Sequence, residues 1–95
     1  MVRSKKAIPQ VVRRTVIIRD RGICQYCGKQ GDYRIFSETG WVWMEHELDH
    51  LIPESKGGQA IIENIVVACR HCNRSKGNKS LIEWGWLNNL DFIRR

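Results

Sequence analysis

Apolar residues near the start of the chain recur with the period of a helix. Between residues 9 and 21, Val12, Val16 and Ile17 would fall on one helical face. Proline is tolerated in the first turn of a helix, and Gly22 is typical of a helix end. The pattern therefore predicts a helix in this region.

Two segments further on have the pattern of strands, residues 33–36 and 41–52, joined by a turn around Gly40. Along the second segment the side chains would alternate between two faces. One face would carry Trp41, Trp43, Glu45, Glu47 and Asp49, and the other Val42, Met44, His46, Leu48 and His50. We expect the four tryptophans of the chain, Trp41, Trp43, Trp84 and Trp86, to pack in the core.

The rest of the pattern predicts a loop over 53–59, a strand over 65–68 and a helix over 70–76 that Gly77 ends. Ser80 is a typical N-cap for a last helix over about 80–93. The apolar residues of that helix, which we expect to pack on the core, are Leu81, Trp84, Leu87 and Leu90.

The chain has 95 residues and 4 cysteines, which indicates one small domain. A domain of this size buries little surface and usually needs a metal or disulfides to fold stably. The start of the chain lacks the apolar core of a signal peptide, and the apolar runs are too short to span a membrane. We therefore expect a cytoplasmic protein, in a compartment where paired cysteines hold metal more often than each other.

Basic residues outnumber acidic ones by 16 to 10, giving a net charge of +6. They concentrate in the N-terminal third and in the run over 70–79. This excess favours a polyanionic partner, most simply nucleic acid. On charge alone, a solvated basic face that aids solubility explains the pattern equally well.

The cysteines form two Cys-x-x-Cys pairs, Cys24 with Cys27 and Cys69 with Cys72. Four thiolates at this spacing favour a structural, tetrahedral Zn²⁺ site. The alternatives are four unligated buried cysteines or a catalytic redox pair. The gap between the pairs is longer than in an ordinary zinc ribbon, so the metal would clamp the two ends of a separate unit.

That unit contains the stretch ELDHLIPESKGG, in which Asp49 and His50 are adjacent, followed by Asn64 in ENIVVAC and Asn73 in CRHCNRSKGN. Here the sequence resembles the HNH endonuclease family, in the form found as small stand-alone proteins of phages and bacteria. The resemblance implies an α+β class and a zinc-stapled ββα-metal (His-Me finger) nuclease fold. It implies a single domain over 1–95, with a motif core over 24–78, a basic N-terminal segment and helix over 1–21, and a C-terminal helix.

The resemblance also implies a role for each motif residue. His50 would be the general base that activates water. Asp49 and Asn73 would hold one catalytic Mg²⁺ or Mn²⁺, and Asn64 would brace the loop that carries His50. The family often has histidine at the position of Asn73; asparagine, found in one branch of the family, favours oxygen ligation and hence Mg²⁺.

One difficulty is that neighbouring residues of a regular strand point to opposite faces. Asp49 and His50 would reach one phosphate only if the strand twists or ends between them. The alternative is a surface aspartate and a packed histidine without a shared function.

The function implied is a metal-dependent DNA endonuclease, nicking or cutting both strands, that leaves 5′-phosphate and 3′-hydroxyl ends. The candidate phosphate contacts are Arg70, Arg74, Lys76 and Lys79. The alternative is a non-catalytic, zinc-stapled nucleic-acid-binding module. By family resemblance, a protein partner such as a phage packaging complex is a further expectation.

Overall fold

The computed structural model describes residues 8–85. Its helices and strands, in chain order, are α1 (Gln10–Asp20), β1 (Tyr33–Ile35), β2 (Val42–Met44), β3 (Glu47–His50), β4 (Ile65–Ala68), α2 (Arg70–Lys76) and α3 (Leu81–Trp84). Two short 3₁₀ turns, Glu54–Lys56 and Ile62–Asn64, lie between β3 and β4. The predicted helices before Gly22 and over 70–76, and the predicted strand over 65–68, are confirmed.

The centre of the molecule is an antiparallel ribbon of β3 and β4, in which His50 lies opposite Ile65 and Glu47 opposite Ala68. Every residue of β4 is buried, because both faces of this strand are covered. On one face, Ile65 and Val67 pack with residues of α1. On the other face, the two remaining residues of β4 join a cluster that contains the cysteines.

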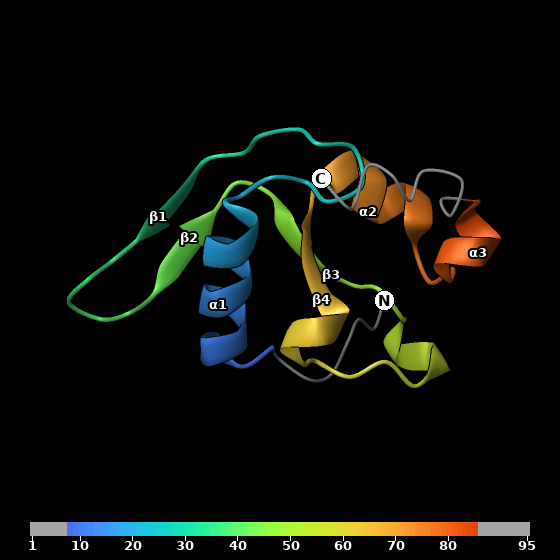
Figure 1. Cartoon of the computed structure of the whole chain (residues 1–95), viewed down its shortest axis with the longest axis horizontal. Helices are drawn as coiled ribbons and strands as arrows, with labels where there is room; N and C mark the ends of the chain where they lie inside the picture. Colours follow the sequence, from blue (N-terminus) through green and yellow to red (C-terminus); the bar gives the residue numbers. More distant parts are fainter. Residues whose placement is uncertain (1–7, 86–95) are drawn as a thin grey trace.

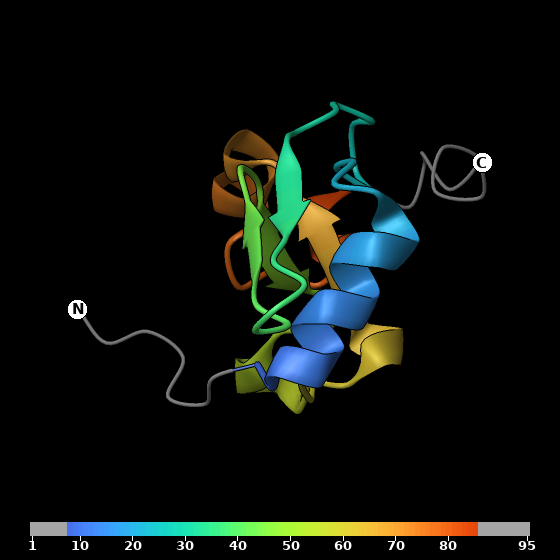
Figure 2. The same cartoon turned by 90° about the vertical axis from the view of Figure 1, so that its left-hand side faces the viewer.

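The C-terminal end of α1 is fastened to β4 by two adjacent side chains. Asp20 is buried and accepts a hydrogen bond from the backbone N–H of Val67 at 3.0 Å. Arg19 donates to the carbonyl oxygens of Ile62 at 3.0 Å and Ile65 at 2.7 Å. These contacts satisfy backbone groups on the outer edge of β4, and Figure 2 shows α1 lying along that strand.

The prediction of one continuous strand over 41–52 is wrong. The chain bends at Glu45 and His46, so β2 pairs with β1 while β3 pairs with β4. His46 is buried, and its Nε2 lies 3.0 Å from the carbonyl oxygen of Lys29. Apolar and polar residues alternate on both sides of the bend, because β2 and β3 are both partly exposed. Such alternation does not show where a strand changes its pairing partner.

The hairpin of β1 and β2 extends away from the ribbon (Figure 1). Trp41 is 57% exposed and Trp43 is 52% exposed, so the prediction that they pack in the core is wrong. Trp84 is partly buried against the cysteine-containing cluster, as predicted. Trp86 lies outside the described residues.

The last described helix, α3, begins with a capping box in which Ser80 accepts a hydrogen bond from the backbone N–H of Glu83. The helix ends at Gly85, whose φ of +79° is left-handed. The predicted helix over about 80–93 is therefore not continuous through Gly85, and Leu87 and Leu90 lie outside the described residues. Over residues 8–85, no helix combines the length and apolar character needed to cross a membrane.

Candidate functional site

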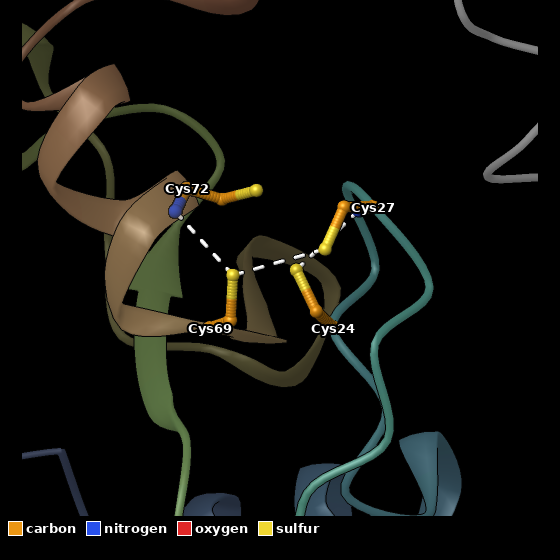
Figure 3. A group of neighbouring side chains, drawn as sticks. All are labelled: Cys24, Cys27, Cys69 and Cys72. Atoms are coloured by element: carbon orange, nitrogen blue, oxygen red, sulfur yellow. Dashed lines mark hydrogen bonds between the residues drawn. The ribbon is translucent and has the colours of Figure 1, made fainter.

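The four cysteines meet at one point, although the two pairs lie far apart in the sequence. Their sulfur atoms point toward one another and all lie within 4.8 Å (Figure 3). Cys24 and Cys27 come from the loop after α1, and Cys69 and Cys72 come from the start of α2. The Sγ atoms of Cys27 and Cys69 are 3.7 Å apart, much farther than the roughly 2.05 Å of a disulfide.

This spacing fits a tetrahedral metal ion. With metal–sulfur bonds of about 2.3 Å, a tetrahedron separates its sulfur ligands by about 3.8 Å, close to the spacing of Cys27 and Cys69. Burial raises the pKa of the Cys27 and Cys72 thiols, whereas for the Cys69 thiol the effect of burial is outweighed by hydrogen bonds, chiefly from Cys72, and its pKa is lowered. A cation among the four sulfurs would balance the charge of their thiolates. The cysteines are therefore positioned to bind metal.

The backbone supports these sulfurs. The N–H of Cys27 donates to the sulfur of Cys24, and the N–H of Cys72 donates to the sulfur of Cys69, both at 3.4 Å. Cys69 is also the N-cap of α2. The metal-binding group thus fixes where α2 begins, and with it the placement of the residues further along the helix.

Asp49 lies on the same face of β3 as the cysteine-containing cluster and is buried. Its Oδ2 accepts a hydrogen bond from the Tyr26 hydroxyl at 2.6 Å and lies 3.3 Å from the Lys76 ammonium. Burial, and then the charge of Asp49, raise the pKa of Tyr26 well above its usual value, so the hydroxyl stays a donor. Nothing in the sequence assigned Tyr26 a role beyond its place between two cysteines.

Lys76 is 0% exposed, and its ammonium donates to the carbonyl oxygen of His50 at 2.8 Å. The prediction that Lys76 contacts phosphate at the surface is wrong, because this ammonium is already held by His50 and Asp49. The signal that could have shown this is helical spacing: Lys76 follows Asn73 by three residues and therefore shares its face of α2.

Asn73, on α2, reaches back to the first residue of β3. Its Nδ2 donates to Oε1 of Glu47 at 2.7 Å. Glu47 and Asp49 are two residues apart on one strand and share a face, so Asn73 and Asp49 belong to the same side of the ribbon. The two residues that the sequence proposed as ligands of the catalytic metal thus lie on one side of the ribbon, and their role as ligands stays a prediction.

His50 lies on the opposite face of the ribbon, with Ile65 as its partner on β4. Strand pairing continues through Asp49 and His50, so the strand does not end between them. The Nε2 atom of His50 is buried without a hydrogen-bond partner among the described residues, and Oε2 of Glu54 lies 3.9 Å away. A buried polar atom without a partner is costly, which points to a use for it.

The face that carries Asp49 and the face that carries His50 adjoin at the edge of β3 that does not pair with β4. On β4, the backbone groups of Val67 and Ile65 point away from β3. The Val67 carbonyl accepts from the N–H of Gln25, the Val67 N–H donates to Asp20, and the Ile65 carbonyl accepts from Arg19. Because bonded and non-bonded pairs alternate in an antiparallel ribbon, His50 also turns its backbone groups away from β4. Lys76, on α2, donates a hydrogen bond to the outward-pointing carbonyl of His50, so α2 lies along this edge of β3.

The loop after His50 is held by Asn64. The Oδ1 of Asn64 accepts a hydrogen bond from the backbone N–H of Ile52 at 2.8 Å, and its Nδ2 donates to the carbonyl oxygens of Ile52 at 3.1 Å and Gln59 at 2.9 Å. Gly58 is needed for the same closure, since a Cβ there would lie 1.7 Å from the Ile52 carbonyl oxygen. These contacts are those expected of a brace, and the catalytic importance of Asn64 stays a prediction.

Arg70, Arg74 and Lys79 are exposed, on or just after α2. Lys79 donates to the carbonyl oxygen of Ser75 at 3.3 Å. These three cations remain available to a phosphate, unlike Lys76.

Residues 24–79 match the family model described as HNH endonuclease, which is more than half of the chain. The chain belongs to the HNH endonuclease family. Its β3–loop–β4–α2 unit, in a small α+β domain with the four cysteines beside it, corresponds to the ββα-metal fold that the resemblance implied.

Two curated proteins are similar to this chain. The type IV methyl-directed restriction enzyme EcoKMcrA of Escherichia coli (strain K12) is 32% identical over 82 residues, covering 82% of this chain and 28% of the enzyme. The CRISPR-associated endonuclease Cas9 of Corynebacterium diphtheriae is 31% identical over 84 residues, covering 87% of this chain and 7% of Cas9. The chain thus spans under a third of either relative.

Proposed function

We propose that the protein is a metal-dependent DNA endonuclease that cleaves phosphodiester bonds to 5′-phosphate and 3′-hydroxyl ends. The observation that carries this proposal is the combination of two candidate oxygen ligands on one side of the ribbon, Asp49 and Asn73, with the adjacent His50, whose Nε2 has no hydrogen-bond partner within residues 8–85. A module that only bound nucleic acid would have no need for a base beside ligands of a hard cation.

In this proposal the scissile phosphate lies near the end of β3, between Asp49 and the adjacent His50. The proposal requires that one phosphate be reached from both faces of the strand, since Asp49 and His50 point to opposite faces. His50 accepts a proton at Nε2 from water as the water oxygen attacks phosphorus, and the bond from phosphorus to the 3′ oxygen breaks. Asn64 keeps the imidazole in place through the loop that it braces.

The carboxylate oxygen of Asp49 and the amide oxygen of Asn73 suit Mg²⁺ or Mn²⁺, since hard cations prefer oxygen ligands. Such a cation, when bound, supplies stabilisation of negative charge on the phosphate and the leaving oxygen. The four cysteines suit a structural Zn²⁺, because soft thiolates in a tetrahedral arrangement select it.

Arg70, Arg74 and Lys79 would contact phosphates that flank the cut, adding affinity without base specificity. The names of both relatives, a restriction enzyme and an endonuclease, support a nuclease. Cleavage of one or both strands, a cytoplasmic location and a partner such as a phage packaging complex remain part of the proposal through family resemblance alone.

The test is cleavage of supercoiled plasmid with Mg²⁺, Mn²⁺ or a chelator, by the full zinc-loaded chain and by His50→Ala. We expect metal-dependent nicking or linearisation that His50→Ala lowers by at least about 100-fold, as for loss of a general base. His71→Ala is the matched control, because His71 is exposed and lies outside the proposed machinery. Plasmid that is shifted on a gel but never cut would support the binding module instead.

A further inference from the structure

Glu47, on β3, is hydrogen-bonded directly to Asn73, the proposed metal ligand on α2. It is half-buried at the start of β3, and its Oε1 lies 2.7 Å from Nδ2 of Asn73. This distance is short for a hydrogen bond from nitrogen to oxygen, as expected when the acceptor is charged.

The chemistry of the two groups determines how the Asn73 amide is turned. A carboxylate has acceptors only, so the amide atom that faces it must be the NH₂ group. The amide oxygen is on the other branch of the same planar group and therefore points away from Glu47. Oxygen is the only atom of an amide side chain that binds a hard cation.

The same arrangement is found at the other proposed ligand. Oδ2 of Asp49 is occupied by the Tyr26 hydroxyl at 2.6 Å and faces the Lys76 ammonium at 3.3 Å. Its Oδ1 is the atom left for a cation. At both proposed ligands, then, neighbouring side chains bind the other polar atom, Oδ2 of Asp49 and Nδ2 of Asn73, and leave one oxygen for the cation.

We propose that Glu47 is a positioning residue that selects the amide oxygen of Asn73 as the metal ligand. This inference rests on the proposed function, since it takes Asp49 and Asn73 as the ligands. Within residues 8–85, Glu47 is the partner that distinguishes the two orientations of the Asn73 amide. Without its carboxylate, the amide could turn its NH₂ group toward the cation, and that orientation cannot bind it. Partners of this kind are worth about 10- to 100-fold in metal affinity or activity.

The competing explanation is that Glu47 is itself a metal ligand. It shares a strand face with Asp49, so geometry on β3 alone permits this. The two explanations differ for Glu47→Gln. A glutamine oxygen still accepts the hydrogen bond from Asn73, whereas it is a poor replacement for a ligating carboxylate.

The experiment measures Mn²⁺ affinity by calorimetry on zinc-loaded full-length protein without DNA, and then plasmid cleavage. A positioning role predicts that Glu47→Ala weakens Mn²⁺ binding about 10- to 100-fold. Glu47→Gln should stay within roughly threefold of wild type, since it replaces a charge-assisted bond with a neutral one of about half the strength. Glu38→Ala, which removes an exposed acid at the far hairpin, controls for charge and should leave affinity unchanged.

The same Glu47 substitutions in an Asn73→Asp variant distinguish a positioning role of Glu47 from a role as metal ligand. In Asn73→Asp the two oxygens are equivalent, so no orientation needs to be selected. There, adding Glu47→Ala should cost far less Mn²⁺ affinity than it does in the wild-type background, because only the attraction of one nearby negative charge is lost. Equal losses for Glu47→Ala and Glu47→Gln, or an undiminished loss in the Asn73→Asp background, would overturn the inference in favour of a ligand.

The outcomes also separate this inference from the proposed function. A wild-type protein that binds Mn²⁺ but does not cut DNA would overturn the nuclease, while the binding series still decides the role of Glu47. Cleavage by wild type with Glu47→Ala unaffected in both assays would overturn the positioning role alone. A wild type that does not bind Mn²⁺ would overturn both.

Discussion

Replacing Lys76 with methionine would remove a charge from one of the least solvated places in the molecule. The Lys76 side chain is 0% exposed, and that of its partner Asp49 is 10% exposed, with 3.3 Å between Nζ and Oδ2. In Lys76→Met the Asp49 carboxylate stays buried without a countercharge, and the carbonyl oxygen of His50 loses its donor. Breaking a buried pair from one side costs about 3–5 kcal/mol.

That cost is large for this chain. A domain of 95 residues has a free energy of unfolding of about 5–14 kcal/mol. With a urea dependence of about 2 kcal/mol/M, a loss of about 3 kcal/mol lowers the unfolding midpoint by about 1.5 M. Tryptophan fluorescence would follow the transition, with zinc held in fixed excess and Mg²⁺ and Mn²⁺ left out, so that no second cation compensates Asp49.

Lys79→Met is the matched control, because Lys79 is exposed and its substitution should change the free energy of unfolding by no more than about 0.5 kcal/mol. Adding Asp49→Asn to Lys76→Met should restore part of the lost stability, since the unpaired charge is then gone. If Lys76→Met and Lys79→Met unfold at the same urea concentration, the buried ion pair makes no contribution and this reasoning fails.

Three further substitutions test other contacts. Cys69→Ser should leave the domain without a cooperative unfolding transition, because a structural metal such as zinc contributes about 10–16 kcal/mol, comparable with the whole free energy of unfolding of the domain. A native-like circular dichroism melt of Cys69→Ser, measured with chelator present, would contradict this. Gly58→Ala should lower the melting temperature more than Gly57→Ala, because its Cβ would lie 1.7 Å from the Ile52 carbonyl oxygen. At Gly57 nothing lies within 4 Å, and the cost of alanine is limited to its φ of +91°. Equal melting temperatures would refute the close approach. Tyr26→Phe removes only a hydroxyl that donates to a buried carboxylate, and should cost about 1–3 kcal/mol by urea unfolding while the metal at the cysteines is retained; an unchanged midpoint would show that the bond contributes nothing.

The sequence predicted correctly those helices and strands that have a characteristic residue at their ends. The bounds of α2 follow from Cys69 as its N-cap and Gly77 after its last residue. The buried strand β4 is a short apolar run with an asparagine before it and a cysteine after it. The meeting of four sulfurs could also be predicted, because a metal requires its ligands to be close however far apart they lie in the chain.

The features that sequence reasoning missed depend on contacts between distant segments. The bend before β3 arises because β2 and β3 pair with different strands, and alternation alone does not identify the partner. The sequence alone predicts a surface cation at Lys76, because burial of its ammonium depends on Asp49 and His50, which lie on another element. The tryptophans of the hairpin were assigned to the core by residue type, and the hairpin extends beyond it.

Tyr26 sits between Cys24 and Cys27, and its hydroxyl ends on Asp49. One short loop therefore supplies both sulfur ligands and a donor that holds the carboxylate. Under the proposed function, a newly made chain that has not captured its structural ion lacks a fixed loop from which Tyr26 could donate. If the proposal holds, a chain without this ion would not cleave DNA, and capture of the ion would set the moment at which the chain becomes an active nuclease.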